Sequence, residues 1–295
     1  MKKVTVFEGV CTALITPFIN DIVDFDSLGK LIERQIDAKI PAVAVCATTG
    51  ESATLTIEEH RRVIRFACEC AKGRIKIIAG TGSNDTRHAV KMSMYACEAG
   101  ADALLVVSPY YNKATQAGLI KSYTAIADAS SVPIIIYNVP TRTCVDISLE
   151  TYAALCRHPR ISAVKEASPY VSKISEIRNL CGNHLDIYSG NDDLTLPLLS
   201  LGAKGAVSVI SNILPEKMSE MCRAFFENDI VKAREIHLSL APLMRALFCE
   251  VNPIPVKYAA SRLGLCHADV RLPLCEISDD GRKKIDKELE KLGLI

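Results

Sequence analysis

Short apolar runs rich in β-branched residues recur along the chain, and a longer segment with helical periodicity follows each of them. Eight such runs occupy residues 11–15, 42–46, 76–80, 103–107, 133–137, 161–165, 185–189 and 205–208. Their first residues lie 20 to 34 positions apart, and a strand–helix–strand unit needs about 30 residues. The spacing therefore predicts eight strands with one helix in each interval.

Two of the runs, 104–107 and 134–136, are apolar at every position, so both faces of these strands must be covered. Parallel sheets have this property, whereas antiparallel sheets commonly expose one face to water. Eight strands in regular alternation with helices favour a closed (β/α)₈ barrel over an open, doubly wound sheet. Helix signals support the pattern: Thr56 and Glu59 form a capping box, and an apolar stripe follows Asp26 and Ser27.

The chain continues well beyond the last predicted strand, and its remaining residues again have helical periodicity. Helices are predicted over 215–227, 230–247, 253–263 and 278–292, with turn signals between them. We therefore expect an α/β protein with a barrel domain over residues 1–225 and a C-terminal helical domain over residues 226–295.

Charge and composition argue against several classes of partner. The net charge is +1 and no basic cluster occurs, which gives little basis for nucleic-acid binding. No apolar stretch reaches the roughly 18 to 20 residues of a membrane span, and the first residues lack the apolar region of a secretory signal. These features predict a cytoplasmic protein that binds neither nucleic acid nor membranes.

The twelve cysteines lie singly, mostly inside apolar runs. They are predicted to be small buried hydrophobic side chains rather than a disulfide framework. The closest pair, Cys68 and Cys70, has neither redox nor zinc-ligand spacing, and no histidine cluster completes a site. We expect no structural metal.

In a (β/α)₈ barrel the active groups lie at the carboxyl ends of the strands and in the loops that follow them. Polar residues occupy these places in five loops: Thr-Thr-Gly-Glu at 48–51, Tyr-Tyr-Asn-Lys at 110–113, Tyr-Asn-Val-Pro-Thr-Arg at 137–142, Lys-Glu at 165–166 and Gly-Asn-Asp-Asp at 190–193.

Lys165 ends a predicted strand and has two interpretations. In the barrel mouth, a desolvated lysine would supply free amine for attack on a carbonyl; alternatively, it is a strand-end lysine paired with a neighbouring carboxylate. Carbonyl chemistry also needs proton shuttles, and the hydroxyl groups of Tyr137, Tyr111 and Thr49 are predicted to converge on the same rim. These hydroxyl groups favour the Schiff-base interpretation.

Five motifs closely resemble those of the dihydrodipicolinate synthase family: T-T-G-E at 48–51, Y-Y-N-K at 110–113, Y-N-V-P-x-R-T at 137–143, V-K-E-A-S at 164–168 and S-G-N-D-D at 189–193. The resemblance runs from Gly9 to residues 252–257. It implies a lyase in which pyruvate forms an imine on Lys165 and condenses with L-aspartate 4-semialdehyde. The implied product is 4-hydroxy-tetrahydrodipicolinate, on the diaminopimelate route to lysine. The resemblance implies no cofactor, since pyruvate is held covalently as the imine on Lys165.

The resemblance also implies roles for the other candidate residues. Tyr137, Thr49 and Tyr111 match the family's proton relay, in which a neighbouring subunit supplies the loop tyrosine, so a homotetramer built from two dimers is implied. The residues that match the pyruvate pocket are Thr48, Gly190 and the backbone at Val207. Arg142 matches the arginine that binds the semialdehyde's carboxylate, a bidentate contact suited to a guanidinium group.

Several alternatives stay open at this point. Sibling aldolases such as N-acetylneuraminate lyase share the T-G-E turn, the tyrosine and the lysine, so a lyase for a sugar acid or another 2-oxo acid is the main one. Sugar-acid lyases generally lack an arginine at the position of Arg142, so this residue favours the synthase over the lyase. The alternative for Arg142 is a loop arginine in a surface ion pair. Two further alternatives are a phosphate-binding isomerase barrel and an inactive barrel that serves as a binding module. Residues 80–85 fail the dinucleotide pattern at its last position, so no nucleotide is expected.

Some positions depart from the family pattern. Cys144 stands where members usually have glycine, which matters if the backbone there needs a positive φ. The positions that match the family's pocket for feedback inhibition by lysine are Ser52, Ala53, His60, Asn84 and Tyr110. In that pocket Ile57 replaces a histidine, and His88 replaces the glutamate that faces the effector's ammonium group. Loss of the carboxylate predicts weak or absent inhibition by lysine.

Overall fold

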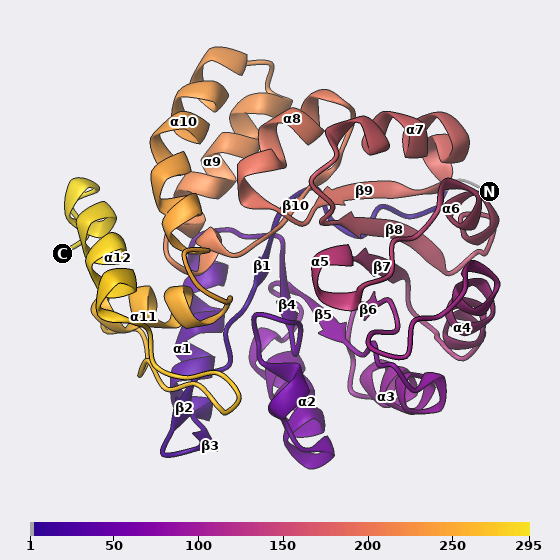
Figure 1. Ribbon diagram of the computed structural model, residues 1–295, viewed down its shortest axis with the longest axis horizontal. Helices are drawn as coiled ribbons and strands as arrows, with labels where there is room; N and C mark the ends of the chain where they lie inside the picture. The colour runs from indigo at the N-terminus through magenta and orange to yellow at the C-terminus, as the bar shows by residue number, and fades with distance from the viewer. Residues whose placement is uncertain (1–2) are drawn as a thin grey trace.

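A computed structural model describes residues 3–295 and shows a closed barrel of eight parallel strands (Figure 1). The strands are β1 (Gly9–Ala13), β4 (Ala42–Val45), β5 (Lys76–Gly80), β6 (Ala103–Val107), β7 (Ile134–Asn138), β8 (Ile161–Glu166), β9 (Asp186–Ser189) and β10 (Gly205–Ser208). Strand β1 pairs with both β4 and β10, which closes the barrel. The predicted fold class and all eight predicted strands are confirmed.

One helix of the outer ring follows each barrel strand. These helices are α1 (Phe25–Asp37), α2 (Ile57–Ala71), α3 (Thr86–Glu98), α4 (Gln116–Asp128), α6 (Leu149–Leu155), α7 (Val171–Cys181), α8 (Thr195–Ser200) and α9 (Pro215–Phe226). The predicted capping box at Thr56 and Glu59 is present at the start of α2. Helix α1 begins earlier than predicted, because Asp24 is its N-cap and accepts a hydrogen bond from the backbone of Ser27.

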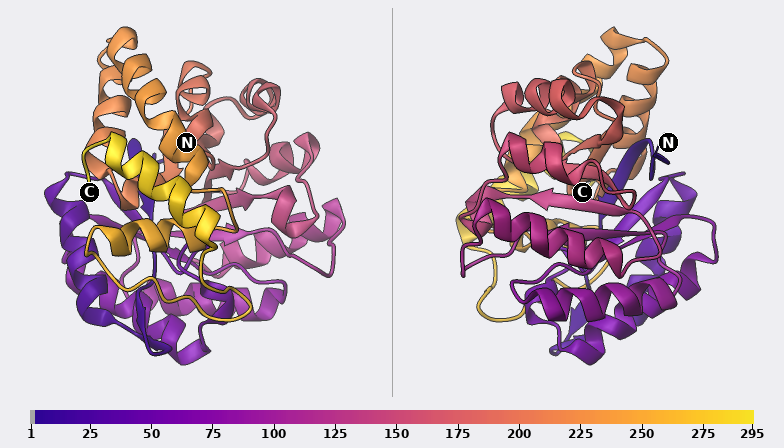
Figure 2. Two further views of the ribbon diagram at one scale, coloured as in Figure 1. Left: turned by 60° about the vertical axis from the view of Figure 1, so that its left-hand side comes forward. Right: turned by 90° about the vertical axis from the view of Figure 1, so that its right-hand side faces the viewer.

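Three further helices, α10 (Ile230–Ala246), α11 (Ile254–Arg262) and α12 (Asp279–Lys291), form the predicted C-terminal extension. Figures 1 and 2 show them gathered at one side of the barrel, where α10 packs against α9 and α12. An irregular segment, residues 263–278, joins α11 to α12. The division of the chain into domains over 1–225 and 226–295 remains a prediction.

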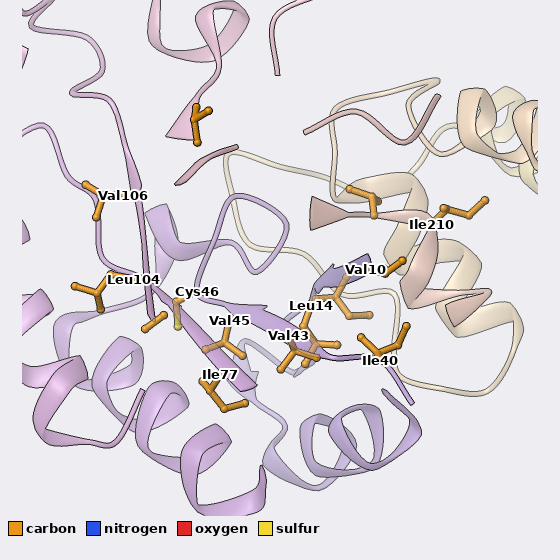
Figure 3. Close-up of a cluster of buried hydrophobic side chains, with 14 of the residues drawn as sticks. Val10, Leu14, Ile40, Val43, Val45, Cys46, Ile77, Leu104, Val106 and Ile210 are labelled. Carbon is orange, nitrogen blue, oxygen red and sulfur yellow. The ribbon is translucent and has the colours of Figure 1, made fainter. Parts of the chain in front are cut away.

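Strand residues alternate between two buried layers. Val43 and Val45 of β4 belong to the layer between strands and helices, together with Ile77 of β5 (Figure 3). Ala42 and Ala44 of the same strand face the barrel interior and belong to a second cluster. Small residues recur in that interior and leave room for larger side chains of the same cluster, among them Tyr137 and Tyr188.

A short antiparallel pair was missed by the sequence analysis. Strands β2 (Phe18–Ile19) and β3 (Ile22–Val23) have two residues each, too few to show an alternating pattern. The signal for it lies in the turn, where Asn20 and Asp21 adopt φ values of 50° and 66°. Asparagine and aspartate tolerate such values and favour tight hairpin turns.

The cysteines only partly match the expectation of buried hydrophobic side chains. All twelve are free; Cys11, Cys46, Cys156, Cys181 and Cys222 are buried, and the others are partly or fully exposed. In the part of the chain that the structure describes, no helix has the length and apolar character needed to cross a membrane.

Candidate active site

Lys165 and Tyr137 lie side by side at the carboxyl ends of neighbouring strands. They are partners in the register of β7 and β8, and their side chains are 4% and 6% exposed. The Nζ atom of Lys165 lies 4.2 Å from the centre of the Tyr137 ring. Among residues 3–295, no carboxylate forms an ion pair with Lys165, so the alternative of a lysine paired with a carboxylate does not describe this structure.

Strand alternation places the next residue, Glu166, on the opposite face, where its buried carboxylate is bound by other groups. It accepts hydrogen bonds from Nδ2 of Asn138 at 2.9 Å, from Oη of Tyr152 at 2.8 Å and from the backbone of Ser168 at 2.8 Å. Burial, followed by the charge of Glu166, raises the pKa of Tyr152 well above its usual value. This network ties the ends of β7 and β8 to each other and to α6.

A cavity of about 290 Å³ opens at the carboxyl ends of the strands and contains most of the candidate residues. Its lining comprises Thr48, Thr49, Tyr137, Val139, Thr141, Arg142, Lys165, Ala167, Pro169, Gly190, Asn191, Val209, Phe248 and Asn252. A keto acid of pyruvate's size would fit beside the lysine amine in this space.

Contacts from the C-terminal extension hold the Thr-Thr-Gly-Glu turn at the edge of the cavity. Thr49 is buried, and its Oγ1 accepts a hydrogen bond from Nδ2 of Asn252 at 3.1 Å. Glu51 has a left-handed backbone with φ 52°, and its Oε1 lies 2.6 Å from Nζ of Lys257. Both members of this ion pair are almost completely buried. Burial lowers the pKa of Lys257, and the Glu51 carboxylate acts in the opposite direction.

Gly190 is required by close packing. A Cβ atom at this position would lie 2.6 Å from the Cβ of Ala167 and 3.0 Å from the carbonyl oxygen of Glu166. Its backbone N–H donates to that same carbonyl at 2.8 Å. Any larger residue would push the loop after β9 away from β8 and enlarge the cavity beside Lys165.

Asp192 is a buried residue that orders the loop after β10. Its buried Oδ2 accepts hydrogen bonds from the backbone N–H groups of Val209 and Ile210, each at 2.9 Å. Burial raises the pKa of Asp192, while a hydrogen bond from Ser208 and the charge of Lys165 act against that rise. Asp192 and Lys165 therefore interact electrostatically, and within the described residues they form no ion pair.

Arg142 lies in the short helix α5 (Pro140–Thr143), at the cavity's outer edge. Its Nη2 donates to the backbone carbonyl of Asn252 at 3.1 Å, and within the described residues it forms no ion pair. The surface ion pair considered for it is therefore not present, and the exposed side chain lines the cavity. Cys144 ends the helix with φ 55°. The backbone at this position is therefore left-handed, which agrees with the glycine that is usual there in the family that the sequence resembles.

Two of the candidate residues lie apart from the others. Tyr111 is 90% exposed, has φ 71° and does not line the cavity. Val207 is buried in the barrel interior, paired with Cys11, and the nearby lining residue is Val209. Lys165 and the remaining candidates line one cavity: Tyr137, Thr49, Thr48, Arg142 and Gly190.

Sequence reasoning missed the groups that support this cavity. Asn252 was noted only as part of a turn signal and as the first residue of segment 252–257, which resembles the family, and Asp192 only as one of the polar residues of the loop motif at 189–193. Their significance comes from contacts with residues more than a dozen positions away along the chain. The Glu51–Lys257 ion pair spans 206 positions and has no local signature.

A second cavity, of about 420 Å³, adjoins the first and shares Thr48, Val139, Arg142 and Asn252 with it. The predicted effector residues that line it are Ser52, Ala53, Ile57, His60, His88 and Tyr110; Asn84 does not. Burial lowers the pKa of His60, whose Nε2 lies 2.8 Å from the carbonyl oxygen of Gly80. His60 is therefore neutral near pH 7.

Comparison with known proteins gives consistent relationships. Residues 6–292 match the profile of the Dihydrodipicolinate synthetase family. The 4-hydroxy-tetrahydrodipicolinate synthase of Aquifex aeolicus is 49% identical over 289 residues, covering 98% of each chain, and its solved structure has a TM-score of 0.96 over 98% of this chain and 99% of that one. The synthase of Cyanidioschyzon merolae, solved with lysine bound, is 36% identical with a TM-score of 0.95 over 98% and 99% of the two chains.

Proposed function

The chain belongs to the dihydrodipicolinate synthetase family, and from that premise we propose that it condenses pyruvate with L-aspartate 4-semialdehyde to give 4-hydroxy-tetrahydrodipicolinate, in the diaminopimelate route to lysine. It is an enzyme of the lyase class. The observation that carries the proposal is the placement of Lys165 next to Tyr137 in one cavity with Arg142.

The reaction begins at the lysine amine. Nζ of Lys165 attacks the keto carbon of pyruvate to form a carbinolamine, and loss of water gives the imine. Removal of a methyl proton converts the imine to an enamine, whose carbon attacks the semialdehyde's aldehyde group. The semialdehyde's own amine then displaces Lys165 from the imine carbon, which closes the ring and frees the enzyme.

Each of these steps moves a proton, and the cavity supplies hydroxyl groups for the transfer. Tyr137 lies against the lysine, and Thr49 lines the same cavity. We assign the third relay position to Tyr111 of a neighbouring subunit. Thr48 and Gly190 border the pyruvate position, and the role expected for the backbone at Val207 remains a prediction. The cytoplasmic location is also still a prediction.

The conformation of Tyr111 supports a contact between two subunits, and we propose the homotetramer made of two dimers that the family resemblance implies. A bulky residue with φ 71° and an exposed ring is a costly arrangement in an isolated chain. Docking of that ring into the cavity of a second copy would offset the cost.

We expect the protein to sediment as a tetramer and the Tyr111→Phe variant to lose about 10²-fold in kcat, because one relay hydroxyl is removed. Mixing Tyr111→Phe with the inactive variant Lys165→Ala should restore activity in mixed dimers, where one cavity has both groups. A fully active monomer, or no recovery on mixing, would contradict the shared tyrosine.

Arg142 is predicted to determine specificity for the second substrate. Arg142→Ala should lower kcat/KM for the semialdehyde by about 10- to 150-fold, since each charge-assisted hydrogen bond contributes about 1.5–3 kcal/mol. Capture of pyruvate as the imine should persist. Arg142→Lys is the matched control, which keeps the charge but not the bidentate geometry and should recover only part of the loss. Equal losses for both substrates would contradict the assignment.

Inhibition by L-lysine is predicted to be weak. Within the described residues, the only carboxylate that lines the second cavity is Glu51, and Lys257 already neutralises it. Asp85 is a candidate to replace the missing carboxylate, but it does not line this cavity and instead caps α3 by accepting a hydrogen bond from the backbone of Arg87. An effector's ammonium group would therefore be desolvated without a partner.

The measurement is an inhibition curve with L-lysine, for the wild type and for the double variant Ile57→His/His88→Glu. We expect the double variant to bind lysine about 10- to 150-fold more tightly, because a charged hydrogen bond is regained. Half-inhibition of the wild type at sub-millimolar lysine would show that the two replacements do not disable the pocket.

The direct test of the proposed function is an assay in which the purified protein is given pyruvate and L-aspartate 4-semialdehyde, and the formation of the cyclic product is measured. The same preparation should leave N-acetylneuraminate uncleaved. Cleavage of the sugar acid with no turnover of the semialdehyde would replace the proposal with the sibling lyase activity.

A further inference from the structure

Asn252 lies between two parts of the proposed catalytic machinery. Its side-chain Nδ2 donates to Oγ1 of Thr49 at 3.1 Å, and its backbone carbonyl accepts from Nη2 of Arg142 at 3.1 Å. The residue is 5% exposed and lines both the 290 Å³ and the 420 Å³ cavity. A residue of the C-terminal extension thus contacts a relay hydroxyl and the specificity arginine at once.

The direction of the bond to Thr49 has a chemical consequence. An amide nitrogen can only donate, so Oγ1 of Thr49 is the acceptor and its own hydrogen must point elsewhere. Thr49 is 3% exposed, and within residues 3–295 its hydroxyl has no other hydrogen-bond partner. The hydroxyl hydrogen therefore remains free for the cavity that Thr49 shares with Tyr137 and Lys165.

Resting on the proposed function, we propose that Asn252 is a positioning residue that sets the direction of the proton relay by keeping the Thr49 hydroxyl a donor toward the cavity that Tyr137 and Lys165 also line. An acceptor in place of the amide nitrogen would reverse the bond. The Thr49 hydrogen would then point at residue 252, and the relay would lose a donor although every hydroxyl group is still present.

The side chain of Asn252 can be changed without releasing the turn that carries Thr49. That turn is held separately by the buried Glu51–Lys257 ion pair, in which Oε1 and Nζ are 2.6 Å apart. The contact with Arg142 is made by the backbone carbonyl and does not depend on the side chain. Variants at position 252 therefore alter the hydrogen bond to Thr49 more than the position of either neighbour.

The test compares Asn252→Asp with Asn252→Ala. Aspartate has nearly the shape of asparagine, but its ionised carboxylate only accepts hydrogen bonds. We expect kcat at pH 8 to fall by about 10²-fold in Asn252→Asp, because a proton transfer contributes on the order of 10²- to 10⁴-fold. Asn252→Ala leaves the hydroxyl free to rotate and should lose only about 10-fold. A purely structural role predicts the opposite order, since aspartate fills the site and alanine leaves a void.

Asn191→Asp is the control for charge. Asn191 lines the same cavity, where its Nδ2 contacts the carbonyl of Ser168, so a carboxylate there repels anionic substrates without accepting from Thr49. We expect Asn191→Asp mainly to raise KM for pyruvate, and Asn252→Asp mainly to lower kcat. Thermal unfolding of each variant identifies any loss of activity that comes from misfolding.

A pH profile gives the second readout. When the carboxyl group introduced by Asn252→Asp is protonated, it can donate a hydrogen bond to Thr49 as the amide does. The ratio of this variant's kcat to the wild-type kcat should therefore rise as the pH falls through the pKa of the introduced carboxyl group. The ratio for Asn252→Ala should stay flat. Two outcomes with an active wild type would overturn the positioning role. One is a kcat of Asn252→Asp at pH 8 that equals or exceeds the kcat of Asn252→Ala. The other is a ratio of Asn252→Asp kcat to wild-type kcat that does not change with pH. An inactive wild type would instead overturn the proposed function.

Discussion

Replacing Lys165 with alanine is expected to abolish the condensation, lowering kcat by about 10⁴- to 10⁶-fold, the range found when a covalent nucleophile is removed from an enzyme. The side chain is buried beside Tyr137, and Lys165 is the only lysine among the described residues that line the cavity, so no other amine is placed to take over its role. Lys257 is fully buried in an ion pair with Glu51 and cannot reach pyruvate.

The measurement is reduction with borohydride in the presence of pyruvate, followed by peptide mass analysis. One reduced adduct should appear on Lys165 in the wild type, and none in Lys165→Ala. Tyr137→Phe is the matched control, because it keeps the ring beside the amine and should form the adduct more slowly but on the same residue. An adduct on Lys113 or Lys257 would refute the assignment of Lys165.

The largest expected effect on stability comes from breaking the Glu51–Lys257 ion pair. Lys257→Met preserves much of the side-chain volume but leaves Glu51 buried without its cation, which costs about 3–5 kcal/mol in the free energy of unfolding. The loss includes the contact between Nζ of Lys257 and the Phe18 ring, whose centre lies 4.1 Å away. Denaturant unfolding measures the change.

The double variant Glu51→Gln/Lys257→Met separates the charge from the packing. It removes both charges and should recover most of the stability, because desolvation already lowers the pKa of Lys257 and the intact pair is costly to bury. If the two single substitutions and the double one have additive effects, the two groups do not act as a pair.

The strand pattern was predicted accurately because nearly every position of the barrel strands is buried, so each strand is a run made mostly of apolar residues. The predicted run 103–107 matches β6, and 161–165 differs from β8 by one residue. Helix starts were less certain, as α1 shows: Asp24, Asp26 and Ser27 are all plausible caps, and only the backbone geometry identifies Asp24. The two-residue strands β2 and β3 are too short for any periodic signal.

The candidate site was predicted to the extent that the barrel's geometry requires it. Lys165 and Tyr137 end adjacent strands, so they lie side by side in any barrel with this register. Tyr111 was expected on the same rim, but in the single chain its loop turns outward. Its place in a partner's cavity, like the roles of the other site residues, is a proposal for experiment.

The sequence by itself determined the (β/α)₈ barrel, the helical extension and the end of the barrel that contains the polar groups, because these follow from local periodicity and from the rule that parallel strands share one carboxyl edge. Only the tertiary structure decided how the Thr-Thr-Gly-Glu turn at 48–51 is held. Asn252 and Lys257 reach Thr49 and Glu51 across more than 200 positions. Such contacts depend on how a C-terminal segment packs against the barrel, and side-chain packing over that separation leaves no periodic trace in the chain.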